Sequence, residues 1–176
     1  MAQGWRITTI NGLLLALYFV PAWTVAAFKI VVFPIRGIYE KANIGPALFV
    51  NDTFQFSALG TVRFAWLLAL AKVVVVAYFL LFALLTLRPE GGKRASGDEA
   101  LALALLFGGI ISVLSMLAAS QVGEAAAVRL HATESLMLLG GFALLVIDSQ
   151  SYGVKPSAMT AAAPATAASE IRSMHH

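Results

Sequence analysis

The chain has 176 residues, of which 60% are hydrophobic and only 12% are charged, against about 25% charged residues in ordinary soluble domains. Its formal net charge of +3 is too small to indicate a nucleic-acid partner. Basic residues that face anionic lipid at a membrane surface explain this charge better. The absence of cysteine excludes thiol catalysis, disulfides and metal sites built from thiolates. The composition therefore predicts an all-α integral membrane protein.

The first hydrophobic segment covers about residues 7–33. It is long enough to span a membrane, because roughly 20 helical residues cross the hydrocarbon layer. Pro21 lies inside this segment and predicts a kink or a break in the helix. A cleaved signal peptide is the alternative, with Arg6 before the apolar run and Val25-Ala26-Ala27 as the cleavage site. We favour a retained span, because the apolar run continues beyond that site.

The connection that follows, residues 34–61, is the longest between two spans and is interrupted by glycine and proline. Within it, Ala47 to Leu59 mixes large apolar residues with polar ones. This stretch is too short and too polar to cross a bilayer. It predicts a segment that lies at the membrane interface, or that docks on the bundle or on a partner.

The second span, residues 62–87, is apolar apart from its ends and Lys72. A charge so deep in a membrane costs at least about 2.5–3.5 kcal/mol, so Lys72 is expected to face protein or water. One interpretation is an ion or proton path, or a contact with a bound anion. The other is a structural ion pair, or an amine kept neutral by desolvation. Glu134 of the fourth span is the predicted partner, because both spans run in the same direction and place these groups on one side of the midplane.

Proline, glycine and mixed charge predict a solvated loop from Arg88 to Glu99. The third span follows at residues 100–120. One stripe of this span carries small residues, which let a neighbouring helix approach closely. The predicted packing residues are Gly108, Gly109, Ser112 and Ser115.

The fourth span covers about residues 125–147 and must take ionisable groups into or near the membrane. At about 100° per residue, Glu124, His131 and Glu134 share one helix face. Two carboxylates and an imidazole on one face can relay protons or bind a ligand. The simpler alternative is a structural pair between His131 and Glu134, three residues apart, at the headgroup level.

The histidine count limits the cofactors. A di-iron bundle needs four carboxylates and two histidines, and the chain has a single His-x-x-Glu, so we predict no metal site. Haem held by two histidines is excluded unless His175 and His176 fold back. Ala127-x-x-x-His131 resembles the pigment-binding turn of antenna polypeptides, in which a small residue makes room for the ring. We predict no cofactor, and His131 is the candidate ligand if a pigment binds.

The sequence predicts one transmembrane domain, residues 1–149, and a polar, disordered tail, residues 150–176. With four spans, both termini lie on one side of the membrane. That side carries six basic residues, namely Arg6, Arg88, Lys93, Arg94, Lys155 and Arg172. The other side carries four, namely Arg36, Lys41, Arg63 and Arg129. This excess predicts cytoplasmic termini in a bacterial-type inner membrane.

No catalytic motif is recognisable, and we predict that the chain is not an enzyme. The predicted function is a non-catalytic accessory or structural subunit of a larger membrane protein complex. Its partners would be the lipid bilayer and other membrane subunits. The alternative is a small transporter or channel-like protein that acts as a homo-oligomer around Lys72 and Glu134.

Overall fold

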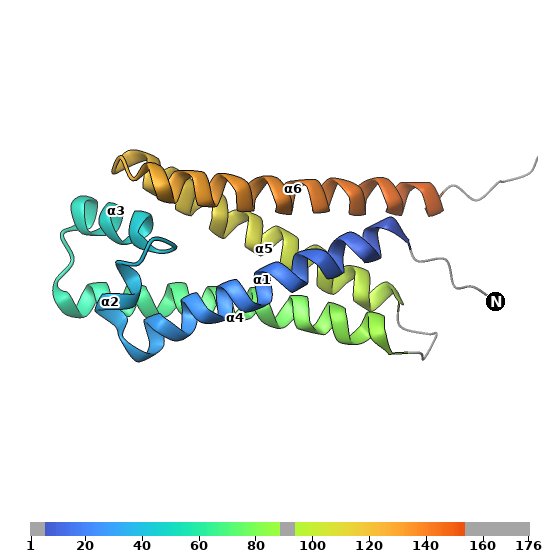
Figure 1. Ribbon diagram of the computed structural model, residues 1–176, viewed down its shortest axis with the longest axis horizontal. Coiled ribbons are helices and arrows are strands. Elements are labelled where there is room, and N and C mark those ends of the chain that lie inside the picture. Colours follow the sequence, from blue (N-terminus) through green and yellow to red (C-terminus); the bar gives the residue numbers. More distant parts are fainter. Residues whose placement is uncertain (1–5, 89–93, 154–176) are drawn as a thin grey trace, which may run out of the picture.

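The computed structural model describes residues 6–88 and 94–153. These residues form six helices and no strand (Figure 1). The helices are α1 (Ile7–Val32), α2 (Pro34–Ile38), α3 (Ile44–Phe54), α4 (Ala58–Leu87), α5 (Arg94–Gln121) and α6 (Ala125–Gly153). Four of them, α1, α4, α5 and α6, are long and apolar enough to cross a membrane. The predicted all-α bundle of four spans is therefore confirmed. The tail from residue 154 on and residues 89–93, with Lys93, Lys155 and Arg172, lie outside the described residues.

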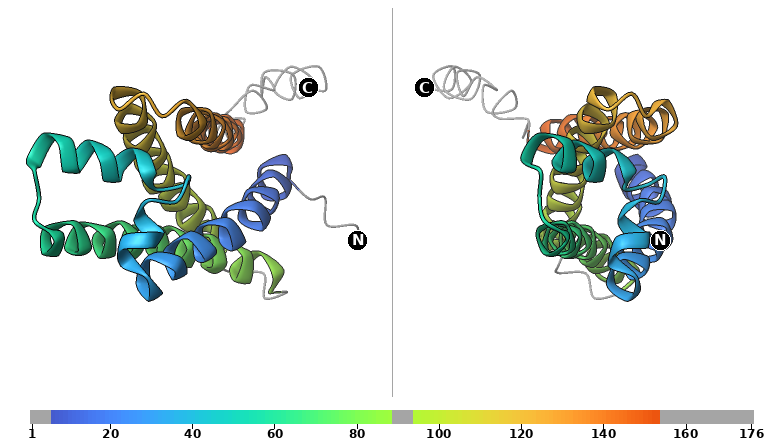
Figure 2. Two further views of the ribbon diagram at one scale, coloured as in Figure 1. Left: turned by 60° about the vertical axis from the view of Figure 1, so that its left-hand side comes forward. Right: turned by 90° about the vertical axis from the view of Figure 1, so that its left-hand side faces the viewer.

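The four long helices run in alternating directions along the bundle (Figure 1). The start of α1, the end of α4, the start of α5 and the end of α6 lie at one end, which we call the terminal end. The two short helices and the turn between α5 and α6 lie at the other, which we call the capped end (Figure 2). Because each of the four long helices can cross a membrane, the capped end would lie at one of its surfaces.

Pro21 does not break the first span, because α1 continues from Ile7 to Val32 as one helix. The proline lies on the exposed face of the helix. The backbone group that the proline leaves unbonded therefore does not disturb a packed interface. Transmembrane helices tolerate proline where local adjustments satisfy the freed backbone groups.

The predicted solvated loop from Arg88 to Glu99 is wrong over its second half, because α5 begins at Arg94. A Cβ on Gly97 would lie 3.8 Å from the side chain of Leu85, and Gly97 is buried. The contact between α4 and α5 therefore continues beyond the apolar part of the third span. Residues 94–99 of α5 are helical along this contact. At the same end Arg6 pairs with Asp98 at 3.4 Å and with Asp148 at 2.8 Å, which joins α1 to α5 and α6.

The segment between the first two spans docks on the bundle through the first half of α3. Gly45 approaches α5 so closely that an added Cβ would lie 2.6 Å from the Cβ of Ala119. From Asn51 to Leu59 every residue is exposed. Gln55, with φ of 47°, ends α3, and the Ser57 side chain caps α4. We call the exposed segment Asn51–Leu59 the ledge.

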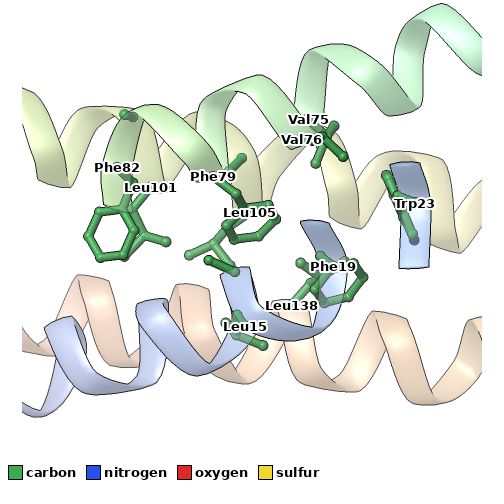
Figure 3. Close-up of a cluster of buried hydrophobic side chains, with 13 residues drawn as sticks. Leu15, Phe19, Trp23, Val75, Val76, Phe79, Phe82, Leu101, Leu105 and Leu138 are labelled. Atoms are coloured by element: carbon green, nitrogen blue, oxygen red, sulfur yellow. The ribbon is translucent and has the colours of Figure 1, made fainter. Parts of the chain in front are cut away.

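The bundle interior contains two separate apolar clusters. The larger one lies toward the terminal end and is built from all four long helices, with Phe19 and Phe79 stacked at 5.7 Å between ring centres (Figure 3). The smaller one lies toward the capped end. Its members are Ala27, Ile30, Ile38, Ala47, Ala65 and Ala69. Polar side chains occupy the level between the two clusters.

Candidate functional site

We call this level the polar layer. It is formed by buried polar side chains of α1, α4, α5 and α6 and of the link between α2 and α3. Its members are Asn43, Lys72, Ser112, His131, Glu134 and Ser135, together with the indole N–H of Trp23, whose ring also belongs to the larger apolar cluster; each residue is at most 5% exposed. The structure thus brings together the two residues predicted to form an intramembrane charge pair, Lys72 and Glu134, with partners from five segments.

Lys72 sits near the middle of α4 and is 2% exposed. Its Nζ donates a short hydrogen bond to Oδ1 of Asn43, and it lies 3.4 Å from the carbonyl oxygen of Ala42. The Asn43 amide in turn donates to the carbonyl oxygen of Gly37 at 3.0 Å. The ammonium group therefore holds the α2–α3 link against the membrane helix.

Glu134 is the acceptor at the centre of the layer. The Trp23 indole N–H donates to Oε1 at 3.1 Å, and the Ser112 hydroxyl donates to Oε2 at 3.3 Å. Nδ1 of His131 lies 2.9 Å from Oε2, where its proton can be donated to the carboxylate. Three neighbouring groups thus stabilise this buried carboxylate, as a charge removed from water requires.

Trp23 joins the two charges. Lys72 and Glu134 do not form a direct ion pair within the described part of the chain. Instead, Nζ of Lys72 lies 5.6 Å from the centre of the Trp23 ring, whose N–H is bound to Glu134. A cation within about 6 Å of an indole face is attracted by it. The ring therefore connects the lysine to the carboxylate.

Two polar atoms of the layer have no partner among the described residues, namely Nε2 of His131 and Oγ of Ser135. Both side chains are buried, at 3% and 5% exposure. They lie four residues apart on α6 and therefore on one side of that helix. This is the part of the layer in which hydrogen bonding is incomplete.

Glu124, the third member of the predicted proton or ligand face, does not join the layer. It precedes the first residue of α6 and is partly exposed. Seven residues separate it from His131, about two helical turns or roughly 10 Å along the axis. Glu124 therefore has the same angular position around the helix axis as the predicted face, but it lies too far along the axis to reach the layer.

The predicted packing residues of α5 divide into two groups. Gly108, Ser112 and Ser115 are buried, and a Cβ on Gly108 would lie 3.4 Å from side chains of both Leu138 and Val75. Gly109 has no atom within 4 Å of its Cβ position, so it faces outward. Three of these small residues therefore pack against other helices of this chain, and the fourth, Gly109, is on the outer face of α5.

The layer does not have the donor set of a metal centre, since no three histidine, aspartate or glutamate residues gather within the described ranges. His131 and Ala127 are both buried, at 3% and 1% exposure. A pigment ring on Nε2 of His131 would need the space that neighbouring helices occupy. His131 as a pigment ligand therefore stays a prediction that the packing of this chain does not favour.

Sequence reasoning assigned no role in this site to Asn43 or to Trp23. For Trp23 a signal exists, because Leu15, Phe19, Trp23 and Ile30 follow one face of α1 and are all buried. Asn43 lies in a turn, where an asparagine is ordinary, and no pattern in the sequence marks it as the partner of a lysine 29 residues away.

Comparisons with models of protein families, with curated proteins and with solved structures found no match to this chain.

Proposed function

We propose that the chain is a non-catalytic structural subunit of a larger membrane protein complex. The observation that carries this proposal is the position of the polar layer between two apolar clusters. Along α4, Lys72 lies between Ala69 of the smaller cluster and Val75 of the larger one. Apolar side chains thus separate the layer from both ends of the bundle. A conducting path is lined by polar groups or water and is interrupted only by narrow apolar gates.

The hydrogen bonds of the layer support the same proposal. Lys72 and Glu134 are engaged by groups of the chain itself. A buried network makes a fold rigid and specific where its members are satisfied, as they are at Lys72 and Glu134 but not at Nε2 of His131 and Oγ of Ser135. Here the network fixes the α2–α3 link, and with it the direction in which α3 leads into the ledge.

The ledge is the surface that a partner would use. Phe54 and Leu59 are each 59% exposed, and the Phe54 and Phe56 rings stack at 5.5 Å between centres. Asn51, Asp52 and Gln55 lie among them. This mixture suits a protein contact at the membrane surface, where aromatic anchors are surrounded by polar groups.

Co-purification tests this proposal. The tagged chain is extracted from its native membrane in mild detergent, and bound proteins are identified and quantified by mass spectrometry. We expect stoichiometric membrane proteins with the wild type and their loss with the double substitution Phe54→Ala and Phe56→Ala. The matched control is Leu136→Ala, which truncates a residue that is 71% exposed on α6. A folded, monodisperse wild-type chain without protein partners would contradict the proposal.

A small oligomeric transporter or channel-like protein is the second candidate, supported by the incomplete hydrogen bonding at His131 and Ser135. A proton carrier needs a group that can exchange partners. Proton flux into liposomes that contain the purified chain, abolished by Glu134→Gln and by Lys72→Met with the fold intact, would favour this candidate over the first.

For the location we propose a bacterial-type inner membrane with both termini in the cytoplasm, supported by the greater number of basic residues on the terminal side. Because the chain has no cysteine, single cysteines report the orientation without background. Thr53→Cys on the ledge should react with an impermeant maleimide added to intact spheroplasts, and Gln150→Cys should react only after lysis. The reverse pattern would place the termini outside.

A further inference from the structure

We propose that the corner between α1 and α2 binds an anionic phospholipid, with the phosphate on Arg36 and the acyl chain along the end of α1. The structure has an open concavity of about 780 Å³ at this corner. It is lined by Val32, Phe33, Pro34, Ile35, Arg36, Tyr39 and Glu40. The corner is the sharp bend at the lower left of the ribbon, beside α4 (Figure 1).

The lining has two chemically different parts. Phe33 and Ile35 are 64% and 57% exposed and form an apolar wall with Val32. Arg36 and Tyr39 place a guanidinium and a hydroxyl beside this wall. An amphiphile with an acyl chain and an anionic headgroup matches both parts, whereas a fully polar anion would leave the wall uncovered.

Charge complementarity selects an anionic headgroup. Arg36 is exposed and forms no ion pair or hydrogen bond with any other described residue. Its planar guanidinium can bind a phosphate through two parallel hydrogen bonds. The carboxylate in the lining, Glu40, is already paired with Lys29 at 2.8 Å, so it does not oppose the phosphate with an uncompensated charge.

The position of the corner agrees with the depth of a headgroup. The first span ends at Val32, and α2 turns back against the capped end of the bundle. Apolar residues of the last turn of α1 therefore face the outer part of the acyl region, while Arg36 lies at the phosphate level. An arginine near a span end extends toward the interface in this way.

Native mass spectrometry tests this site. The purified full chain in detergent is titrated with dioleoyl phosphatidylglycerol and, separately, with dioleoyl phosphatidylcholine. We expect one preferentially bound phosphatidylglycerol per chain and little phosphatidylcholine. Arg36→Gln should lower the fraction of bound phosphatidylglycerol about fivefold, as expected for the loss of one basic group at an anionic surface.

The matched control is Arg63→Gln, which removes an exposed arginine at the same end of the bundle but outside the concavity. It should leave lipid binding unchanged, and Arg36→Lys should restore part of it, which separates the loss of charge from misfolding. Equal losses for Arg36→Gln and Arg63→Gln would show general surface electrostatics and overturn the site. Displacement of the lipid by millimolar glycerol phosphate would also overturn it, because the acyl contact would then contribute nothing.

Discussion

The charge of Lys72, buried at membrane depth, is stabilised without a carboxylate in direct contact. Its ammonium group is held by an asparagine side chain, a backbone carbonyl and an indole ring. All three are neutral, and the acid of the layer, Glu134, accepts a hydrogen bond from the N–H of that ring instead of contacting the lysine. The energetic coupling of Lys72 should therefore be stronger to Asn43 than to Glu134.

Double-mutant cycles measure this difference. Lys72→Met is combined with Asn43→Leu in one cycle and with Glu134→Gln in another, and each protein is unfolded thermally in detergent. Lys72→Met alone should lower stability by about 1–3 kcal/mol, because the two buried acceptors lose their donor. The coupling with Asn43 should exceed the coupling with Glu134. A larger coupling with Glu134 would show that the predicted charge pair dominates after all.

A single substitution at Trp23 tests the hydrogen bond from its indole to Glu134. Trp23→Phe keeps an aromatic ring and removes the N–H that is donated to Glu134. Leaving that carboxylate with one donor fewer should cost about 1–3 kcal/mol of unfolding free energy. The control is Trp66→Phe, because Trp66 is 55% exposed and should change stability by no more than about 0.5 kcal/mol. Equal effects of the two substitutions would mean that the indole hydrogen bond contributes nothing.

At the scale of the elements, α3 depends on one close approach. A Cβ on Gly45 would lie 2.8 Å from Cα of Ala119, a backbone atom that cannot turn away. Gly45→Ala should push α3 from α5 at a cost of about 1–3 kcal/mol and make α3 more susceptible to protease. Gly109→Ala is the control, since its Cβ meets nothing within 4 Å.

Hydrogen exchange and limited proteolysis in detergent read this effect directly. Exchange should rise across residues 44–54 in Gly45→Ala and stay unchanged in Gly109→Ala. Wild-type protection of α3 in Gly45→Ala would show that the helix is held by the Lys72–Asn43 contact alone.

The elements also show what a sequence can and cannot reveal. The spans follow from hydropathy, because lipid demands about 20 apolar residues in a helix. The first six residues of α5, 94–99, could not be predicted as helix from hydropathy, because they lie beyond the apolar run and Gly97 packs beside Leu85 of a different helix. The angle on a helix placed Glu124 with His131, but the helical rise over seven residues, roughly 10 Å, already separates them, so the shared face alone was too weak a criterion.

At the scale of the whole molecule, two apolar clusters enclose one polar layer. The sequence identified Lys72, His131 and Glu134 as costly in lipid and therefore as inward-facing. It could not identify Asn43 or the role of Trp23, because their contacts join residues 29 and 111 positions apart. Such contacts arise when the helices assemble, not within any one of them.

The proposed role of an accessory subunit requires the ledge to contact another protein. Photo-cross-linking in intact native membranes tests it most directly, with a photoreactive amino acid at Phe54 and, as the lipid-facing control, at Leu136. We predict a discrete adduct between position 54 and a different membrane protein, absent at position 136. A ledge that cross-links only lipid, or only a second copy of this chain, would contradict the role of an accessory subunit.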